Sequence, residues 1–166
     1  MKRIFPFTII FLSFIIQSTL FQFISIMDII PNISLLFLVI FSIQLGEYYG
    51  GLLGLFLGIL TDAMYLSIFG INTLIYFIIG YSLGKFKDNV YREDYLTYFL
   101  AVALTSIAYN IFFYIIIFFL GIDTGGLSEI MKPIVLEMIL NLILLYPVLK
   151  LEFLLIDKVG IKVKYY

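Results

Sequence analysis

The sequence predicts an all-α membrane protein, with six transmembrane helices in a single integral membrane domain over residues 1–166. The first observation is composition: 63% of the residues are hydrophobic and 13% are charged, against ~45–50% and ~25% in soluble domains. The second is that the charges cluster between apolar tracts, and about 20 apolar residues suffice for a helix to cross a ~30 Å hydrocarbon core. The third is that the basic residues fall in alternate loops, as they do in polytopic membrane proteins.

We place the helices at residues 4–27, 33–45, 50–65, 71–84, 95–120 and 133–156. The first tract exceeds the ~7–15 apolar residues of a signal peptide and shows no small-residue cleavage site, so we expect it to remain as a helix. The second and third tracts are short for full spans, and only Gly46-Glu47 separates them. The sequence therefore defines the boundaries of helices two to four less closely than those of the others.

The ten Lys and Arg residues indicate the orientation. With the amino terminus in the cytoplasm, nine of them lie on the inner side and only Lys132 lies in an outer loop. Cytoplasmic loops of membrane proteins carry an excess of Lys and Arg. Six helices also keep both the basic carboxyl-terminal tail and the charged stretch at residues 85–94 inside. The sequence therefore predicts a multi-pass plasma-membrane protein with both termini in the cytoplasm.

The residues that the chain lacks argue against several functions. It has no Cys, His or Trp. It therefore lacks thiolates and disulfides, and it lacks the imidazole that commonly transfers protons or binds metals near neutral pH. The sequence contains no metalloprotease, serine-hydrolase or phosphate-binding-loop motif. We expect no enzymatic activity, no cofactor, no metal and no nucleic-acid partner.

Two rows of small and polar residues are the most regular feature of the sequence. In each row the residues are four positions apart, which keeps them on one slowly drifting face of a helix. The rows are Gly46, Gly50, Gly54, Gly58 and Asp62 on the expected third helix, and Asn72, Tyr76, Gly80 and Gly84 on the fourth. Glycines let membrane helices approach closely, so we expect these two helices to pack as a tight pair. The alternative is that the glycine row forms a docking groove for another protein.

Asp62 and Glu137 are the two acids that we place within helices, where charged groups are costly and are candidates for function. Asp62 lies sixteen residues after Gly46, about 24 Å of helix, and Glu137 follows Lys132 by about one and a half turns. Both carboxylates are therefore expected in one layer just below the outer surface. Three interpretations remain open: hydration with pairing to Lys132, contact with a partner or ligand, and a proton relay. Asn110 and Asn141 lie deeper, and we expect them to form hydrogen bonds between helices.

Several short motifs occur in a distinctive order over residues 31–85. They are Pro-Asn at residues 31–32, the glycine row ending in Asp at 50–62, Gly-Ile-Asn followed by a Tyr at 70–76, and Gly-Tyr-Ser-Leu-Gly-Lys at 80–85. In this order and spacing, the stretch resembles the rod shape-determining protein MreD family. Ile71 stands where Leu is usual. The rest of the chain resembles the family in hydropathy, in length and in the charged loop near residue 90.

The resemblance implies a non-catalytic scaffold in the bacterial plasma membrane, within the machinery of cell elongation and rod shape. It implies MreC as the direct partner. It also implies a larger complex with MreB and the peptidoglycan synthases, RodA and a class B penicillin-binding protein, in the lipid bilayer. Asp62, Glu137, Asn141 and the two rows are the residues that we expect to shape the partner-binding surface, directly or by holding the helices in place.

The resemblance also implies a fold similar to the substrate-binding subunits of energy-coupling-factor transporters. A substrate-binding subunit of such a vitamin transporter is therefore the alternative function. Those subunits dock their coupling partner through an Ala-x-x-x-Ala motif on the first helix. Residues 4–27 contain no Ala, which favours the shape-determining function.

Overall fold

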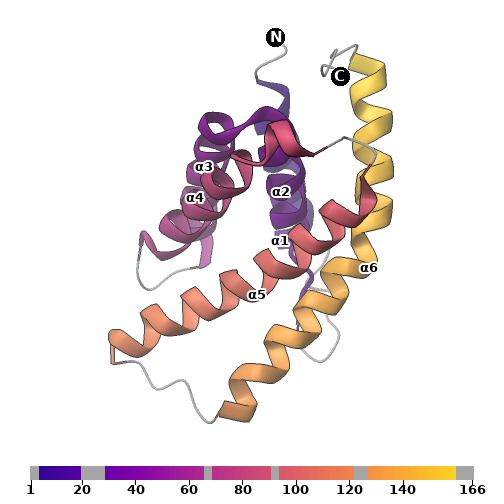
Figure 1. Ribbon diagram of the computed structural model, residues 1–166. Coiled ribbons are helices and arrows are strands. Elements are labelled where there is room, and N and C mark those ends of the chain that lie inside the picture. Colours follow the sequence, from indigo (N-terminus) through magenta and orange to yellow (C-terminus); the bar gives the residue numbers. More distant parts are fainter. Residues whose placement is uncertain (1–3, 20–28, 66–68, 91–93, 122–126, 160–166) are drawn as a thin grey trace.

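The structure is a computed structural model that describes residues 4–19, 29–65, 69–90, 94–121 and 127–159 (Figure 1). Within these ranges the chain forms six α-helices and one short 3-10 helix, with no strand. The elements are α1 (Phe5–Thr19), α2 (Ile33–Leu45), α3 (Glu47–Tyr65), α4 (Ile71–Gly84), η2 (Lys87–Asn89), α5 (Tyr95–Phe119) and α6 (Leu127–Val159). The predicted all-α class is confirmed. Residues 20–27, which we placed in the first helix, lie outside the described residues.

The starts of α3 and α6 differ most from those expected from the sequence, whereas α2 and α4 have the expected bounds. α3 begins at Glu47 instead of Gly50. Gly46, with a φ of 98°, turns the chain after α2, and its carbonyl accepts the N–H of Gly50 at 2.8 Å, so α3 starts directly at the turn. α6 begins at Leu127 instead of Pro133. A proline removes one backbone hydrogen bond, and a membrane helix tolerates that loss without ending there.

α2 forms the centre of the bundle. It contacts α1, α3, α4, α5 and α6, and every residue from Ser34 to Gln44 is buried. A helix that is apolar around its whole circumference is typically enclosed by other elements. At its start, the side chain of Asn32 accepts the N–H of Leu35 at 3.0 Å and caps the helix. α2 therefore offers a common packing surface to the other five helices.

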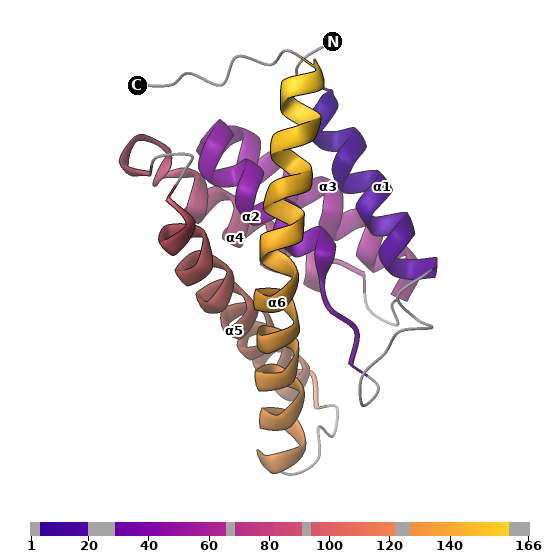
Figure 2. The ribbon, with the colours of Figure 1, turned by 90° about the vertical axis from the view of Figure 1, so that its right-hand side faces the viewer.

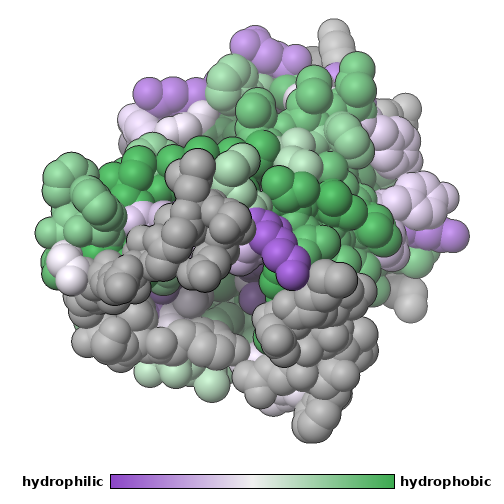
Figure 3. All heavy atoms as spheres, turned by 90° about the horizontal axis from the view of Figure 1, so that it is seen from below, coloured by the Kyte–Doolittle hydropathy of each residue, from purple (hydrophilic) through white to green (hydrophobic). Residues whose placement is uncertain are grey.

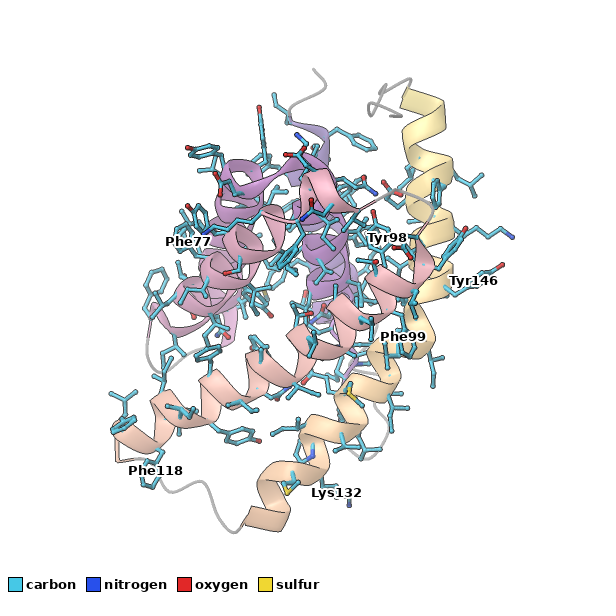
Figure 4. All side chains as sticks on the ribbon, in the orientation of Figure 1. Phe77, Tyr98, Phe99, Phe118, Lys132 and Tyr146 are labelled. Atoms are coloured by element: carbon cyan, nitrogen blue, oxygen red, sulfur yellow. The ribbon has the colours of Figure 1, made fainter. Side chains whose placement is uncertain are left out.

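α5 and α6 are long and apolar enough to cross a membrane. Only 22% of the most apolar stretch of each is buried, and Leu104, Phe118 and Ile143 are 65% to 69% exposed. The core helix of a soluble protein would bury such side chains, so these faces are suited to lipid. Figure 4 shows Phe118 and Tyr146 pointing away from the bundle, and Figure 3 shows hydrophobic residues over much of the surface at one end.

The turns lie at two opposite ends of the bundle (Figures 1 and 2). The start of α1, the turn at Gly46, η2 and the last turns of α6 share one end, which we call the chain-end side. The turn at Gly70 and the last turn of α5 lie at the other end.

At the start of α5, Asp94 accepts hydrogen bonds from the hydroxyl and the backbone N–H of Thr97. These bonds lower the pKa of the Asp94 carboxyl below its usual value.

Candidate functional site: glycine contacts and a buried polar network

α3 and α4 pack with their backbones in direct contact. A Cβ atom added at Gly54 would lie 2.1 Å from the carbonyl oxygen of Tyr76. Gly50 and Gly80 face each other in the same way, because a Cβ on Gly80 would lie 2.1 Å from the carbonyl oxygen of Gly50. Atoms that are not bonded do not approach this closely, so only glycine fits at these positions.

The backbones of α3 and α4 also approach each other this closely at Gly58 and Gly84. A Cβ added at Gly58 would lie 2.2 Å from the Cα of Thr73, and one at Gly84 would lie 2.4 Å from the Cα of Glu47. Gly46, in the turn, lies instead next to the side chain of Lys87. The glycine faces of α3 and α4 are therefore covered by each other within the chain. They are not open to another protein.

Asp62 lies in the last turns of α3 and caps the start of α4. Its Oδ2 accepts the backbone N–H groups of Gly70 and Thr73, both at 2.9 Å, and also the Thr73 hydroxyl. Its Oδ1 accepts the backbone N–H and the side-chain Nδ2 of Asn72, both at 3.0 Å. The first N–H groups of a helix lack acceptors within the helix, and the helix dipole favours a negative charge there. Asp62, only 2% exposed, thus joins α3 to α4.

Two stacked tyrosines continue the contacts from Asn72. The hydroxyl of Tyr109 donates to Oδ1 of Asn72 at 2.7 Å. Its ring stacks on that of Tyr76 with 5.0 Å between the centroids. The hydroxyl of the buried Tyr76 accepts Nδ2 of Asn32 at 2.9 Å. These contacts connect α4 to α5 and to the start of α2.

Asn141 and Asn110 carry the contacts to α6. Oδ1 of Asn141 accepts the backbone N–H of Asn32 at 2.7 Å, and its Nδ2 donates to the hydroxyl of Ser106 at 2.9 Å. Nδ2 of Asn110 donates to Glu137 at 2.8 Å and to the carbonyl of Ser106 at 2.9 Å. Both asparagines therefore form hydrogen bonds between helices, as we expected from their depth in the apolar tracts.

We give the name polar network to nine of these connected side chains: Asn32, Asp62, Asn72, Tyr76, Ser106, Tyr109, Asn110, Glu137 and Asn141. It links α2, α3, α4, α5 and α6. Polar groups buried in a membrane protein are costly unless they are hydrogen-bonded, so the network favours one arrangement of these helices. Among the described residues, no cluster of three or more acidic or other metal-ligating side chains could hold a metal ion.

Glu137 does not pair with Lys132, which was one interpretation left open by the sequence. Its carboxylate accepts Asn110 instead, while Lys132 is exposed on the first part of α6 (Figure 4). A third acid, Glu152, was missed: it lies in α6 and is fully buried. The sequence does indicate it, because Glu152 is an acidic residue inside the apolar tract at residues 133–156.

Sequence reasoning also missed three members of the polar network. Asn32 entered the sequence analysis only through the Pro-Asn motif, although an Asn just before an apolar tract is a common helix cap. Tyr109 and Ser106 were not singled out. Both precede Asn110 on the same apolar tract, so hydroxyl and amide groups recur there at helical spacing. That recurrence could have identified the buried face of α5.

The fold and the network define a helical membrane protein whose buried polar groups bond helix to helix. The chain matches the family model described as rod shape-determining protein MreD over residues 1–154. It therefore belongs to the MreD family, which is a family of membrane proteins with a role in rod shape determination and is not a known enzyme family. This confirms the resemblance seen over residues 31–85. No curated protein and no solved structure matches the chain.

Proposed function

We propose that this chain is a non-catalytic scaffold of the cell-elongation machinery, which binds MreC directly and links it to peptidoglycan synthesis. In this proposal MreB, RodA and a class B penicillin-binding protein belong to the larger complex. The observation that carries the proposal is the match to the MreD family over residues 1–154. The polar network also supports the proposal. Its carboxylates and amides form hydrogen bonds with one another and with backbone groups, and these bonds hold the helices together.

The exposed surface also supports recognition through helices. The glycine rows are used within the chain, so a partner meets the outer faces of the bundle. Those faces carry apolar side chains along α5 and α6, including Leu104 and Ile143. In lipid, a partner helix associates by close packing and hydrogen bonds without a hydrophobic driving force. A bundle fixed by internal contacts provides the constant surface that such packing requires.

The proposal includes six membrane-spanning helices with both chain ends in the cytoplasm, arranged like the substrate-binding subunits of energy-coupling-factor transporters. α2 and α4, with 13 and 14 residues, are only about 20 Å long at ~1.5 Å per residue. α2 is enclosed by the other helices, so it need not match the ~30 Å hydrocarbon core by itself. The distribution of Lys and Arg supports the orientation.

Cysteine labelling tests the topology, because the chain has no cysteine of its own. In intact cells, Asn89→Cys should resist a membrane-impermeant maleimide and should react after lysis, since residue 89 follows α4 on the inner side. Thr124→Cys, placed between the fifth and sixth spans, should react in intact cells. Labelling of Asn89→Cys from outside would contradict the proposed orientation.

Co-purification with MreC tests the partner. In a mild detergent, the full chain should retain MreC, and so should Thr61→Val, which removes only a hydroxyl bonded to its own helix at Leu57. Asp62→Leu should lose MreC, because the start of α4 loses the carboxylate that holds it to α3, which alters the outer faces of the bundle. Tight binding of a vitamin by the purified chain, with no MreC retained, would favour the transporter subunit instead.

A further inference from the structure

A cavity of about 430 Å³ opens at the chain-end side, away from the polar network. It lies between the turn that joins α2 to α3 and the segment that runs from the end of α4 into η2. Its volume falls within the ~300–1,000 Å³ typical of small-molecule sites. The side chains that concern its chemistry are Glu47, Tyr48, Tyr49, Lys85, Lys87 and Asp88.

The cavity carries two charges of each sign. Lys85 and Lys87 supply ammonium groups, and Glu47 and Asp88 supply carboxylates. Nζ of Lys87 donates to the last carbonyl of α2 at 3.2 Å, which leaves N–H donors for a second acceptor. In the described part of the chain these four side chains form no ion pair with one another. Charges of both signs are therefore available to a ligand.

Two tyrosines give the cavity an aromatic rim. Tyr48 is 77% exposed and Tyr49 is half-buried. Tyrosines gather where hydrocarbon meets water, because the ring is apolar and the hydroxyl is polar. The six-span topology proposed above places the chain-end side at the inner boundary of the membrane. On that placement, the cavity can receive the headgroup of a lipid whose acyl chains stay in the bilayer.

We propose that this cavity binds the headgroup of a phospholipid that carries both a phosphate and a primary ammonium, such as phosphatidylethanolamine. The phosphate accepts hydrogen bonds from Lys85 and Lys87, and the ammonium donates to Glu47 and Asp88. Such charge-assisted bonds are about twice as strong as neutral ones. A purely anionic headgroup meets two carboxylates that repel it. The quaternary ammonium of phosphatidylcholine has no N–H to donate to them.

Binding to the delipidated full chain in detergent tests this proposal. The probes are phosphatidylethanolamine, phosphatidylcholine and phosphatidylglycerol with identical acyl chains, measured by native mass spectrometry. We expect phosphatidylethanolamine to bind about tenfold more tightly than either of the others, because each of these loses charge-assisted hydrogen bonds. Inorganic phosphate and phosphoethanolamine at equal concentration should not displace it, because the acyl chains contribute to binding. Displacement by either soluble probe would overturn the assignment to a lipid.

Single substitutions locate the site. Lys87→Gln and Asp88→Asn should each weaken phosphatidylethanolamine binding about tenfold, and Asp88→Asn should also reduce its preference over phosphatidylglycerol. Lys132→Gln, an exposed lysine on α6 outside the cavity, should leave binding unchanged. Equal binding of phosphatidylglycerol and phosphatidylethanolamine would overturn the proposal, as would unchanged binding in both cavity variants. Cysteine labelling and MreC retention are measured separately, so a failure here is distinguishable from failure of the proposed topology or function.

Discussion

Asp62→Leu is expected to destabilise the protein by at least about 3 kcal/mol. The substitution removes the acceptor of two buried donors, the backbone N–H and the Nδ2 of Asn72, and of the partly buried N–H groups of Gly70 and Thr73. Each buried donor left unsatisfied costs about 1–3 kcal/mol. It also removes the negative charge at the start of α4, where the helix dipole favours one. The melting temperature of the purified protein in detergent measures the effect. If the variant cannot be purified as monodisperse protein, the destabilisation is larger still.

Two further variants separate this effect from a general response to polar-to-apolar changes at the end of α3. Thr61→Val is nearly isosteric and removes one hydrogen bond to Leu57 in the same helix, so it should be mild. Asp62→Asn keeps one acceptor oxygen but turns an amide N–H₂ toward N–H donors, so its melting temperature should fall between those of wild type and Asp62→Leu. Equal melting temperatures for Asp62→Leu and Thr61→Val would contradict the capping role.

The parts of the fold that sequence predicted are those with local signals. α2 and α4 have the expected bounds because Asn32 and Gly70 mark their starts and glycines mark or follow their ends. The start of α3 was missed because a single residue, Gly46, makes the turn before it. The start of α6 lies before the one expected, because a proline often marks a helix boundary, whereas the missing N–H of Pro133 disturbs only one bond.

The site shows a similar division between local and long-range information. A spacing of four residues is local, so the sequence could place Gly50, Gly54 and Gly58 on one face of a helix. The partners of the buried polar groups depend on how distant helices are arranged. Asn32 and Asn141 bond across 109 positions in the chain, and no spacing rule predicts that contact. Depth alone likewise suggested Lys132 for Glu137, whereas the orientation of α6 brings Asn110 to it.

Gly54→Ala is the second substitution with a large expected effect. The added methyl group would lie 2.1 Å from the carbonyl oxygen and 2.6 Å from the carbonyl carbon of Tyr76. These are backbone atoms of α4, so they cannot move without shifting the helix. Overpacking typically costs about 1–3 kcal/mol, and a clash with backbone should lie at or above the upper end. The melting temperature in detergent should fall accordingly, and Gly58→Ala, whose methyl meets the Cα of Thr73, should behave alike.

Gly51→Ala is the matched control, on the same helix and with the same chemical change. Its methyl group would meet side-chain atoms and no backbone: the ring edge of Phe77 at 3.1 Å and the Cβ of Tyr81 at an ordinary contact distance of 3.7 Å. The Phe77 ring can move by the few tenths of an ångström that this requires. Alanine also favours a helix over glycine by about 1 kcal/mol, a gain that both variants share. Gly51→Ala should therefore be neutral or slightly stabilising, while Gly54→Ala is strongly destabilising. The difference between them isolates the close approach of α3 and α4, and equal melting temperatures would show that these backbones are not in contact.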